Sequence, residues 1–158
     1  MNDILTIILL TLLPISELRG SIPYGIFNTG LSPAVVFAVA VAANILLAKG
    51  IFIFVRKAMP FFVQFAHINT VYTKFVLRTQ QKIHPYIEKY GVLGLAIFIG
   101  IPLPGSGVYT GALGAYLLGF TYKEFFKAAV IGVLMAGILV LLASTLGEGV
   151  WNIFIKQV

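Results

Sequence analysis

Two segments of the chain are apolar over the length that a membrane-spanning helix requires. They cover residues 33–55 and 125–146, and the second is weakened near its start by Lys127. A helix needs about 20 predominantly apolar residues to cross a hydrocarbon core of ~30 Å. The pattern therefore predicts two spanning helices.

Four further apolar stretches are too short to cross a bilayer: residues 4–15, 22–31, 91–101 and 107–120. At about 1.5 Å per residue, each gives roughly 15 to 21 Å of helix. They form two pairs, divided by the breaks PISELRGSIP (14–23) and IPLPGSG (101–107). Short, interrupted segments at corresponding places in two halves are typical of re-entrant hairpins, which enter the membrane and return to the same side.

The order of short pair, break and long span occurs twice, so each half is predicted to be a re-entrant helical hairpin followed by one transmembrane helix. One crossing per half turns the second half over. The breaks also share a Gly-Ser pair, starting at Gly20 and at Gly105, 85 residues apart, although a match this short also arises by chance. We therefore expect an all-α integral membrane protein with two inverted repeats in a single membrane domain, 1–158: repeat 1 at 1–58, an amphipathic cytoplasmic connector at 59–90 and repeat 2 at 91–158.

The composition agrees with a bilayer as the solvent. Of the 158 residues, 59% are hydrophobic and 10% are charged, which is more apolar surface than a water-soluble domain of this size hides. Sixteen glycines and seven prolines favour broken or closely packed helices. The first segment begins with Asp3 instead of a basic run, so we expect it to be retained and not cleaved as a signal peptide.

The distribution of charge predicts which side of the membrane each segment faces. Seven of the eleven Lys and Arg residues lie between positions 49 and 89, and the turn before the second span adds Lys123 and Lys127. By the positive-inside rule, the connector at 57–90 is cytoplasmic and both termini lie outside. The net charge of +6 does not indicate a nucleic-acid partner, because no soluble basic domain carries it.

Lys74, Arg78 and Lys82 recur every four residues within the connector, as in an amphipathic helix that lies on the inner leaflet. The plain interpretation is a solvated basic face that anchors the protein. Recruitment of phosphate groups is the alternative.

Glu17 and Arg19 lie at the predicted tip of the first hairpin. A charge at the centre of a bilayer costs at least ~2.5 to 3.5 kcal/mol on insertion scales, so ionisable groups there call for a functional hypothesis. One interpretation is structural: the two residues pair with each other or cap the short helices beside them. In the other, Arg19 binds an anionic substrate and Glu17 carries a proton that moves with transport.

The break in the second half contains no charge, but its prolines interrupt the helix and expose backbone. The helix that starts near Ser106 or Gly107 directs its unpaired N–H groups at the tip, which suits a carboxylate or phosphate. A purely structural turn is the alternative. If the two tips meet near the middle of the membrane, Asn44 of the first span, with Tyr109 and Thr110, is expected to line the cavity between them. The candidate residues for substrate binding or coupling are Glu17, Arg19, Gly20, Ser21, Pro23, Pro102, Pro104, Gly105, Ser106, Tyr109 and Thr110.

Catalytic and metal chemistry have little support in the sequence. The chain has no cysteine, and its two histidines, His67 and His84, both fall in the connector without a carboxylate cluster. There is also no phosphate-binding loop and no nucleophile elbow. We therefore expect no enzymatic activity, no cofactor and no metal.

SELRGSIPYGI in the first half and GIPLPGSGVYTGALGAYLLGFTYKEFF in the second resemble the small multidrug export family, over nearly the whole chain. That family is similar to the wider DedA/VTT superfamily, whose members are thought to have inverted repeats of a re-entrant hairpin and a membrane helix. Some of them translocate polyprenyl-phosphate carriers or scramble phospholipids. Glu17 matches the acidic residue of the DedA first hairpin in kind. Two arginines of the DedA second hairpin are replaced here by Gly100 and by Ser106 or Gly107, so binding of a lipid phosphate would depend on Arg19 alone.

The resemblance and the residues together imply a small DedA-like membrane transporter for a small or amphipathic anion. Lipid-linked phosphate is a subclass of that substrate, and coupling to protons through Glu17 is an option. The alternatives are a lipid scramblase and a non-transporting membrane scaffold with a basic cytoplasmic face. Two spanning helices are too few to enclose a sealed pathway, so we expect a homodimer. We expect it to be surrounded by membrane lipids in the cytoplasmic membrane of a prokaryote.

Overall fold

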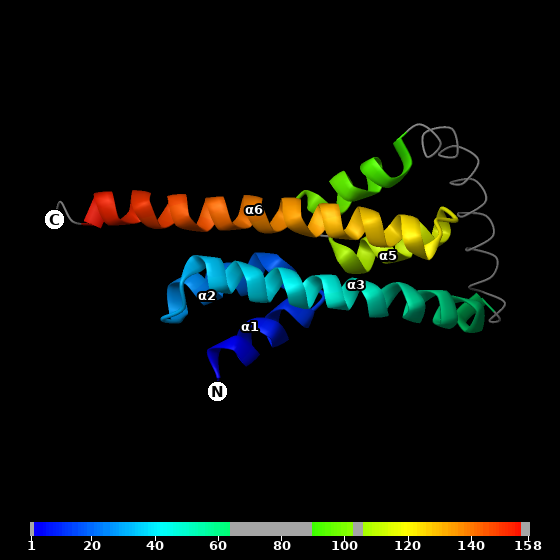
Figure 1. Cartoon of the computed structure of the whole chain (residues 1–158), viewed down its shortest axis with the longest axis horizontal. Helices are drawn as coiled ribbons and strands as arrows, with labels where there is room; N and C mark the ends of the chain where they lie inside the picture. Colours follow the sequence, from blue (N-terminus) through cyan, green and yellow to red (C-terminus); the bar gives the residue numbers. More distant parts are fainter. Residues whose placement is uncertain (1, 64–89, 103–105, 156–158) are drawn as a thin grey trace.

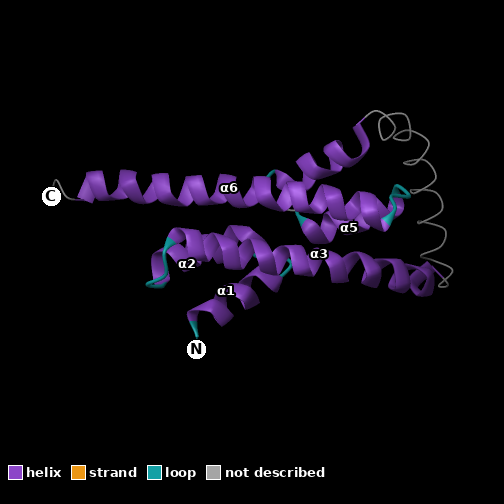
Figure 2. Cartoon of the chain, viewed as in Figure 1, coloured by secondary structure: helices purple, strands orange, loops and turns teal. Residues whose placement is uncertain are grey.

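The computed structural model describes residues 2–63, 90–102 and 106–155, and every regular element among them is a helix (Figures 1 and 2). An all-α protein was predicted, and this is confirmed for the described residues. The labelled helices are α1 (Asp3–Leu12), α2 (Glu17–Asn28), α3 (Pro33–Val63), α5 (Val108–Leu117) and α6 (Tyr122–Ile155). A further helix, Tyr90–Gly100, precedes α5.

The two longest helices, α3 and α6, lie side by side and run in opposite directions (Figure 1). Both are long and apolar enough to cross a membrane, over Pro33–Phe61 and Tyr122–Gly147. The positions of the two predicted spans are therefore confirmed. Both helices extend beyond the predicted limits of 33–55 and 125–146.

The extensions have local causes. The apolar run of α3 ends before Arg56 and Lys57, but both residue types favour a helix, so α3 continues to Val63. The start of α6 is set by Thr121 and Glu124. The Glu124 carboxylate accepts from the Thr121 N–H at 2.8 Å, and the Thr121 hydroxyl accepts from the Glu124 N–H at 3.3 Å, which is a capping box.

The predicted connector at 59–90 begins within α3, because that helix includes Pro60 and ends at Val63. The repeating basic pattern that predicted an amphipathic helix, Lys74, Arg78 and Lys82, lies outside the described residues.

The short helices form two hairpins. In Figure 1, α1 and α2 turn back on each other beside the middle of α3, so the N-terminus and the end of α2 lie at the same end of the molecule. Helix Tyr90–Gly100 and α5 turn back in the same way, with their outer ends at the opposite end of the molecule. The tips of the two hairpins therefore approach each other between the long helices.

The first break is shorter than predicted. We expected residues 14–23 to interrupt the helix, but α2 begins at Glu17, and Gly20, Ser21 and Pro23 are helical. Pro23 removes one backbone hydrogen bond, the one that would reach the Arg19 carbonyl, but one missing bond need not end a helix whose other residues remain bonded. Only residues 13–16 are left to make the turn.

Glycines allow the hairpins to pack closely on the long helices. A Cβ added to Gly25 of α2 would lie 2.4 Å from Val36 of α3. A Cβ added to Gly132 of α6 would lie 2.7 Å from Ile99 of helix Tyr90–Gly100. Each hairpin also packs on the long helix of the other half, because α2 packs on α6 and α5 packs on α3. Close packing through small residues is the usual means of association for apolar helices.

Candidate functional site at the hairpin tips

Glu17, the first residue of α2, is held in an uncommon conformation. Its φ angle is +41°, in the left-handed region that residues other than glycine adopt at a cost of roughly 1 to 3 kcal/mol. Its side chain is only 6% exposed. A buried carboxylate on a strained residue must be stabilised by its surroundings, and here the stabilising group belongs to the other hairpin.

The Glu17 carboxylate lies at the beginning of α5. Its Oε2 atom accepts a hydrogen bond from the backbone N–H of Val108 at 3.2 Å. Val108 is the first residue of α5, so the carboxylate lies at the positive end of that helix. Gly107 makes the approach possible, because its φ is +123° and an added Cβ would lie 2.6 Å from Oε2.

Arg19 makes a second link between the tips. One of its terminal nitrogens, Nη2, donates to the Ser106 carbonyl at 2.6 Å and to the Ser106 hydroxyl at 2.9 Å. The Ser106 hydroxyl in turn donates to the carbonyl of Ile101, at the end of the preceding helix. Arg19 thereby binds Ser106, which is bonded in turn to the end of helix Tyr90–Gly100.

Both charged side chains of the first tip therefore bind the second tip, and neither bonds to the other in the described part of the chain. These contacts support one of the two interpretations that the sequence left open for Glu17 and Arg19, capping of a neighbouring short helix, although the helix capped is in the other half. They also bear on the second break. The sequence left open whether the N-terminus of α5 offers its N–H groups to a substrate or belongs to a structural turn, and the Val108 N–H is taken by Glu17.

A small cavity separates the two charges from the long helices. Its volume is about 10 Å³, which is close to the room that one water molecule needs. Glu17 and Arg19 line it together with Asn44, which is 1% exposed on α3. The Asn44 side-chain oxygen has no hydrogen-bond partner among the described residues. The remaining walls are apolar: Leu18, Ile99, Val108, Val133 and Ala136.

The other candidate residues lie at varying distances from this cluster. Ser21 is fully buried in α2, and its hydroxyl has no partner among the described residues. Pro102 is exposed just after helix Tyr90–Gly100, and Thr110 is exposed on α5 with its hydroxyl on the Gly107 carbonyl. Pro104 and Gly105 lie outside the described residues.

Gly107 was named from the sequence as a possible start of the helix after the second break, but neither it nor Val108 was among the candidate site residues. The signal was present, since GSG follows two prolines in IPLPGSG. The sequence does not say which glycine of the turn takes the left-handed conformation, because that depends on Glu17 approaching from the other half.

Tyr109 ties the hairpins together once more, because its hydroxyl donates to the carbonyl of Leu12 at the end of α1. We expect Tyr109→Phe to destabilise the protein by about 1 kcal/mol, since one hydrogen bond is lost and the ring remains. Thermal unfolding in detergent measures the effect. Tyr116→Phe is the matched control on the same helix, because no hydrogen bond of the Tyr116 hydroxyl occurs among the described residues. Equal unfolding temperatures for the two variants would contradict the role given to Tyr109.

The two apolar helices of spanning length indicate an integral membrane protein, and the charges between its short hairpins are shielded, because Glu17 is buried and Arg19 is half-buried. Residues 17–139, most of the chain, match the model of a family described as "Putative small multi-drug export protein". The chain belongs to this family, whose name describes a small membrane exporter and is consistent with a transporter. No curated protein and no solved structure matches the chain.

Proposed function

We propose that this protein is a small membrane transporter that moves a small or amphipathic anion through the site where the hairpin tips meet. The observation that carries the proposal is the bonding of Arg19. Only its Nη2 nitrogen has acceptors among the described residues, and both are neutral oxygens of Ser106. A guanidinium has five N–H donors in a planar fork that suits carboxylate and phosphate. A half-buried cation with donors to spare is a binding group for an anion.

The proposal includes the membrane arrangement expected from the sequence. The two hairpins enter the bilayer from opposite sides as inverted repeats, as in the DedA/VTT superfamily, and their tips meet near its centre. Two features support this arrangement: the ends of each hairpin lie at the same end of the molecule (Figure 1), and α1 and Tyr90–Gly100 are too short to cross. Irregular backbone at that depth is tolerated where it is buried in protein.

Glu17 is assigned to coupling. An ionised Glu17 is attracted to the N-terminus of α5 and holds the tips together. A proton on Glu17 removes that attraction and leaves Arg19 as the one charge of the cavity lined by Glu17, Arg19 and Asn44. The site then favours an anion, so proton and anion move in the same direction. Arg19 is thus assigned to binding and Glu17 to coupling, and no catalytic step is proposed. The second subunit of a homodimer would supply the helices that complete the enclosure of the pathway.

The experiment is a flux measurement with purified protein in liposomes. One set of liposomes is placed in a medium that contains a water-soluble fluorescent organic anion, and a second set carries a short-chain fluorescent phosphatidylglycerol in one leaflet. The transporter proposal predicts that the protein accelerates movement of at least one probe about tenfold over empty liposomes, and that an inward proton gradient drives uptake.

The possible outcomes separate the candidate functions. Movement of the lipid probe in both directions, without response to a proton gradient, would identify a scramblase and remove the coupling role of Glu17. If folded, reconstituted protein moves neither probe, the transporter proposal is wrong and a membrane scaffold remains.

A further inference from the structure

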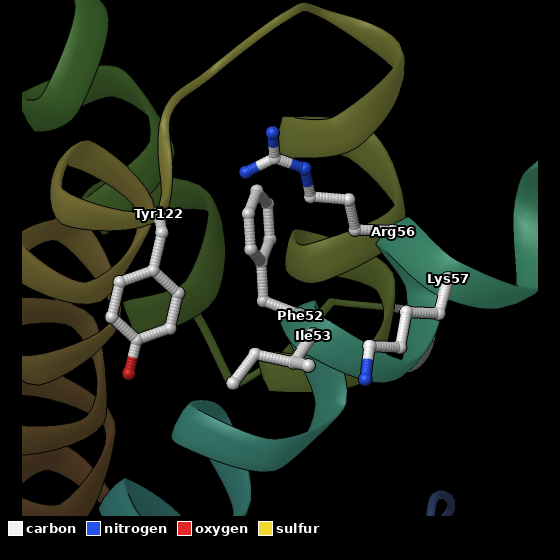
Figure 3. A pocket seen from close by; sticks show the side chains of 5 residues that line it. All are labelled: Phe52, Ile53, Arg56, Lys57 and Tyr122. Atoms are coloured by element: carbon white, nitrogen blue, oxygen red, sulfur yellow. The ribbon is translucent and has the colours of Figure 1, made fainter.

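A second pocket lies away from the hairpin tips, where α3 approaches the beginning of α6. Its volume is about 450 Å³, within the range of pockets that hold small ligands. Figure 3 shows its lining: Phe52, Ile53, Arg56 and Lys57 from α3, and Tyr122 from α6. Phe52 follows Asn44 by eight residues, more than two helical turns, so this pocket is distinct from the cavity beside Glu17.

The pocket is cationic. Arg56 and Lys57 are both exposed, and neither has an ion-pair partner among the described residues. The nearest acidic residue in the sequence of the facing helix, Glu124, already accepts hydrogen bonds from Thr121. Two adjacent cations therefore remain available to an anion from outside the described chain.

Beside the cations, the wall of the pocket is apolar. Phe52 is 1% exposed and stacks on Phe125 of α6, with ring centroids 4.7 Å apart. The Tyr122 ring lies 6.1 Å from that of Phe52 on another side. Ile53 and Phe54 continue along α3 and are 46% and 64% exposed, so the apolar surface extends out of the pocket. A ligand that fits this surface has a negative group and a hydrocarbon tail.

The position of the pocket identifies the source of such a ligand. Basic residues gather at this end of the two long helices: Lys49, Arg56 and Lys57 on α3, and Lys123 and Lys127 on α6. By the positive-inside rule this end lies at the cytoplasmic leaflet, which is rich in anionic lipid. Tyrosine and long basic side chains are the residues expected at the headgroup level.

We propose that this pocket binds an anionic phospholipid of the cytoplasmic leaflet. The phosphate lies against Arg56 and Lys57, and an acyl chain follows Ile53 and Phe54. Bound there, the lipid joins the end of α3 to the beginning of α6.

Native mass spectrometry of the detergent-solubilised full chain tests the proposal. The probes are phosphatidylglycerol and phosphatidylcholine of the same acyl chains. The test variant is Arg56→Gln with Lys57→Gln. The matched control is Lys123→Gln with Lys127→Gln, which removes the same charge at the same end of the molecule from residues outside the pocket lining. Thermal unfolding of both variants checks that they are folded.

The wild-type protein is expected to retain phosphatidylglycerol at least about fivefold better than phosphatidylcholine. The pocket variant loses this preference and the control variant keeps it. Equal losses in the two variants would mean that diffuse surface charge is responsible, and the pocket proposal is then wrong. Displacement of the lipid by inorganic phosphate would also overturn it, because the pocket would then serve a free anion. No flux is measured, so failure here leaves the transport proposal unaffected.

Discussion

Gly107→Ala is expected to lower the unfolding temperature of the protein in detergent by about 5 °C. Two effects add at this position. The φ angle of +123° lies in a region that alanine rarely adopts, and the new Cβ would lie 2.6 Å from one Glu17 carboxylate oxygen and 2.9 Å from the other. Strain of this kind costs roughly 1 to 3 kcal/mol, and each kcal/mol corresponds to ~2 to 4 °C for a chain of this size.

Gly114→Ala is the matched control, because Gly114 is inside α5, the helix that Gly107 precedes, and nothing lies within 4 Å of its added Cβ. Alanine is about 1 kcal/mol better than glycine inside a helix, so this variant should unfold at the same or a higher temperature. A third variant identifies the cause. Combining Gly107→Ala with Glu17→Ala removes the clash with the carboxylate, so the pair should be less destabilising than the sum of its members. If Gly107→Ala and Gly114→Ala behave alike, the contact between the tips is not the one described.

Arg19→Ala is expected to reduce anion flux at least about tenfold, because the variant removes the cation proposed to bind the anion and both bonds to Ser106. Arg19→Lys keeps the charge but loses the planar fork, so an intermediate flux is expected. Arg19→Gln keeps hydrogen-bonding ability without charge and should resemble Arg19→Ala. The measurement is initial flux in liposomes that contain equal amounts of each protein. Full flux in Arg19→Ala would remove Arg19 from the substrate site.

Glu17→Gln separates coupling from binding. The amide has nearly the shape of the carboxylate and can still accept the Val108 N–H, so the variant is expected to fold. It cannot exchange a proton, and flux should therefore continue without any response to a proton gradient. The readout is the ratio of flux with and without the gradient, which a merely structural role of Glu17 would leave unchanged.

The sequence predicted the elements of this fold better than the contacts between them. The lengths of the apolar runs identified both spanning helices, because crossing a bilayer imposes a length that composition reveals. The same reasoning placed Gly20 and Pro23 in a break, and both proved to be helical. Local propensity suggested an interruption, but the packing of α2 on α3 and α6 outweighs it.

The candidate site was also predicted only in part, because the sequence does not show contacts between distant residues. Glu17 and Arg19 stood out because charge inside an apolar segment is costly. Ser106 was also a candidate, but neither it nor Val108 was predicted as a partner of these charges. They lie 87 and 91 residues away and contribute a carbonyl, a hydroxyl and a backbone N–H. Every residue except proline has a backbone N–H, and every residue has a carbonyl, so no sequence pattern marks those two groups as partners. Only the meeting of the tips brings these residues together.

The proposed meeting of the two hairpin tips inside the membrane is tested most directly by labelling single cysteines, because the chain has none of its own. Ile15 is at the first tip and is 94% exposed, Gly30 follows α2 with open space around it, and Lys123 is exposed at the start of α6. A bulky, membrane-impermeant maleimide should label the Gly30→Cys variant from outside and the Lys123→Cys variant from the cytoplasm. It should label the Ile15→Cys variant from neither side. Labelling of Ile15→Cys from the cytoplasm would mean that α1 and α2 both cross the bilayer, and the account of the site would be wrong.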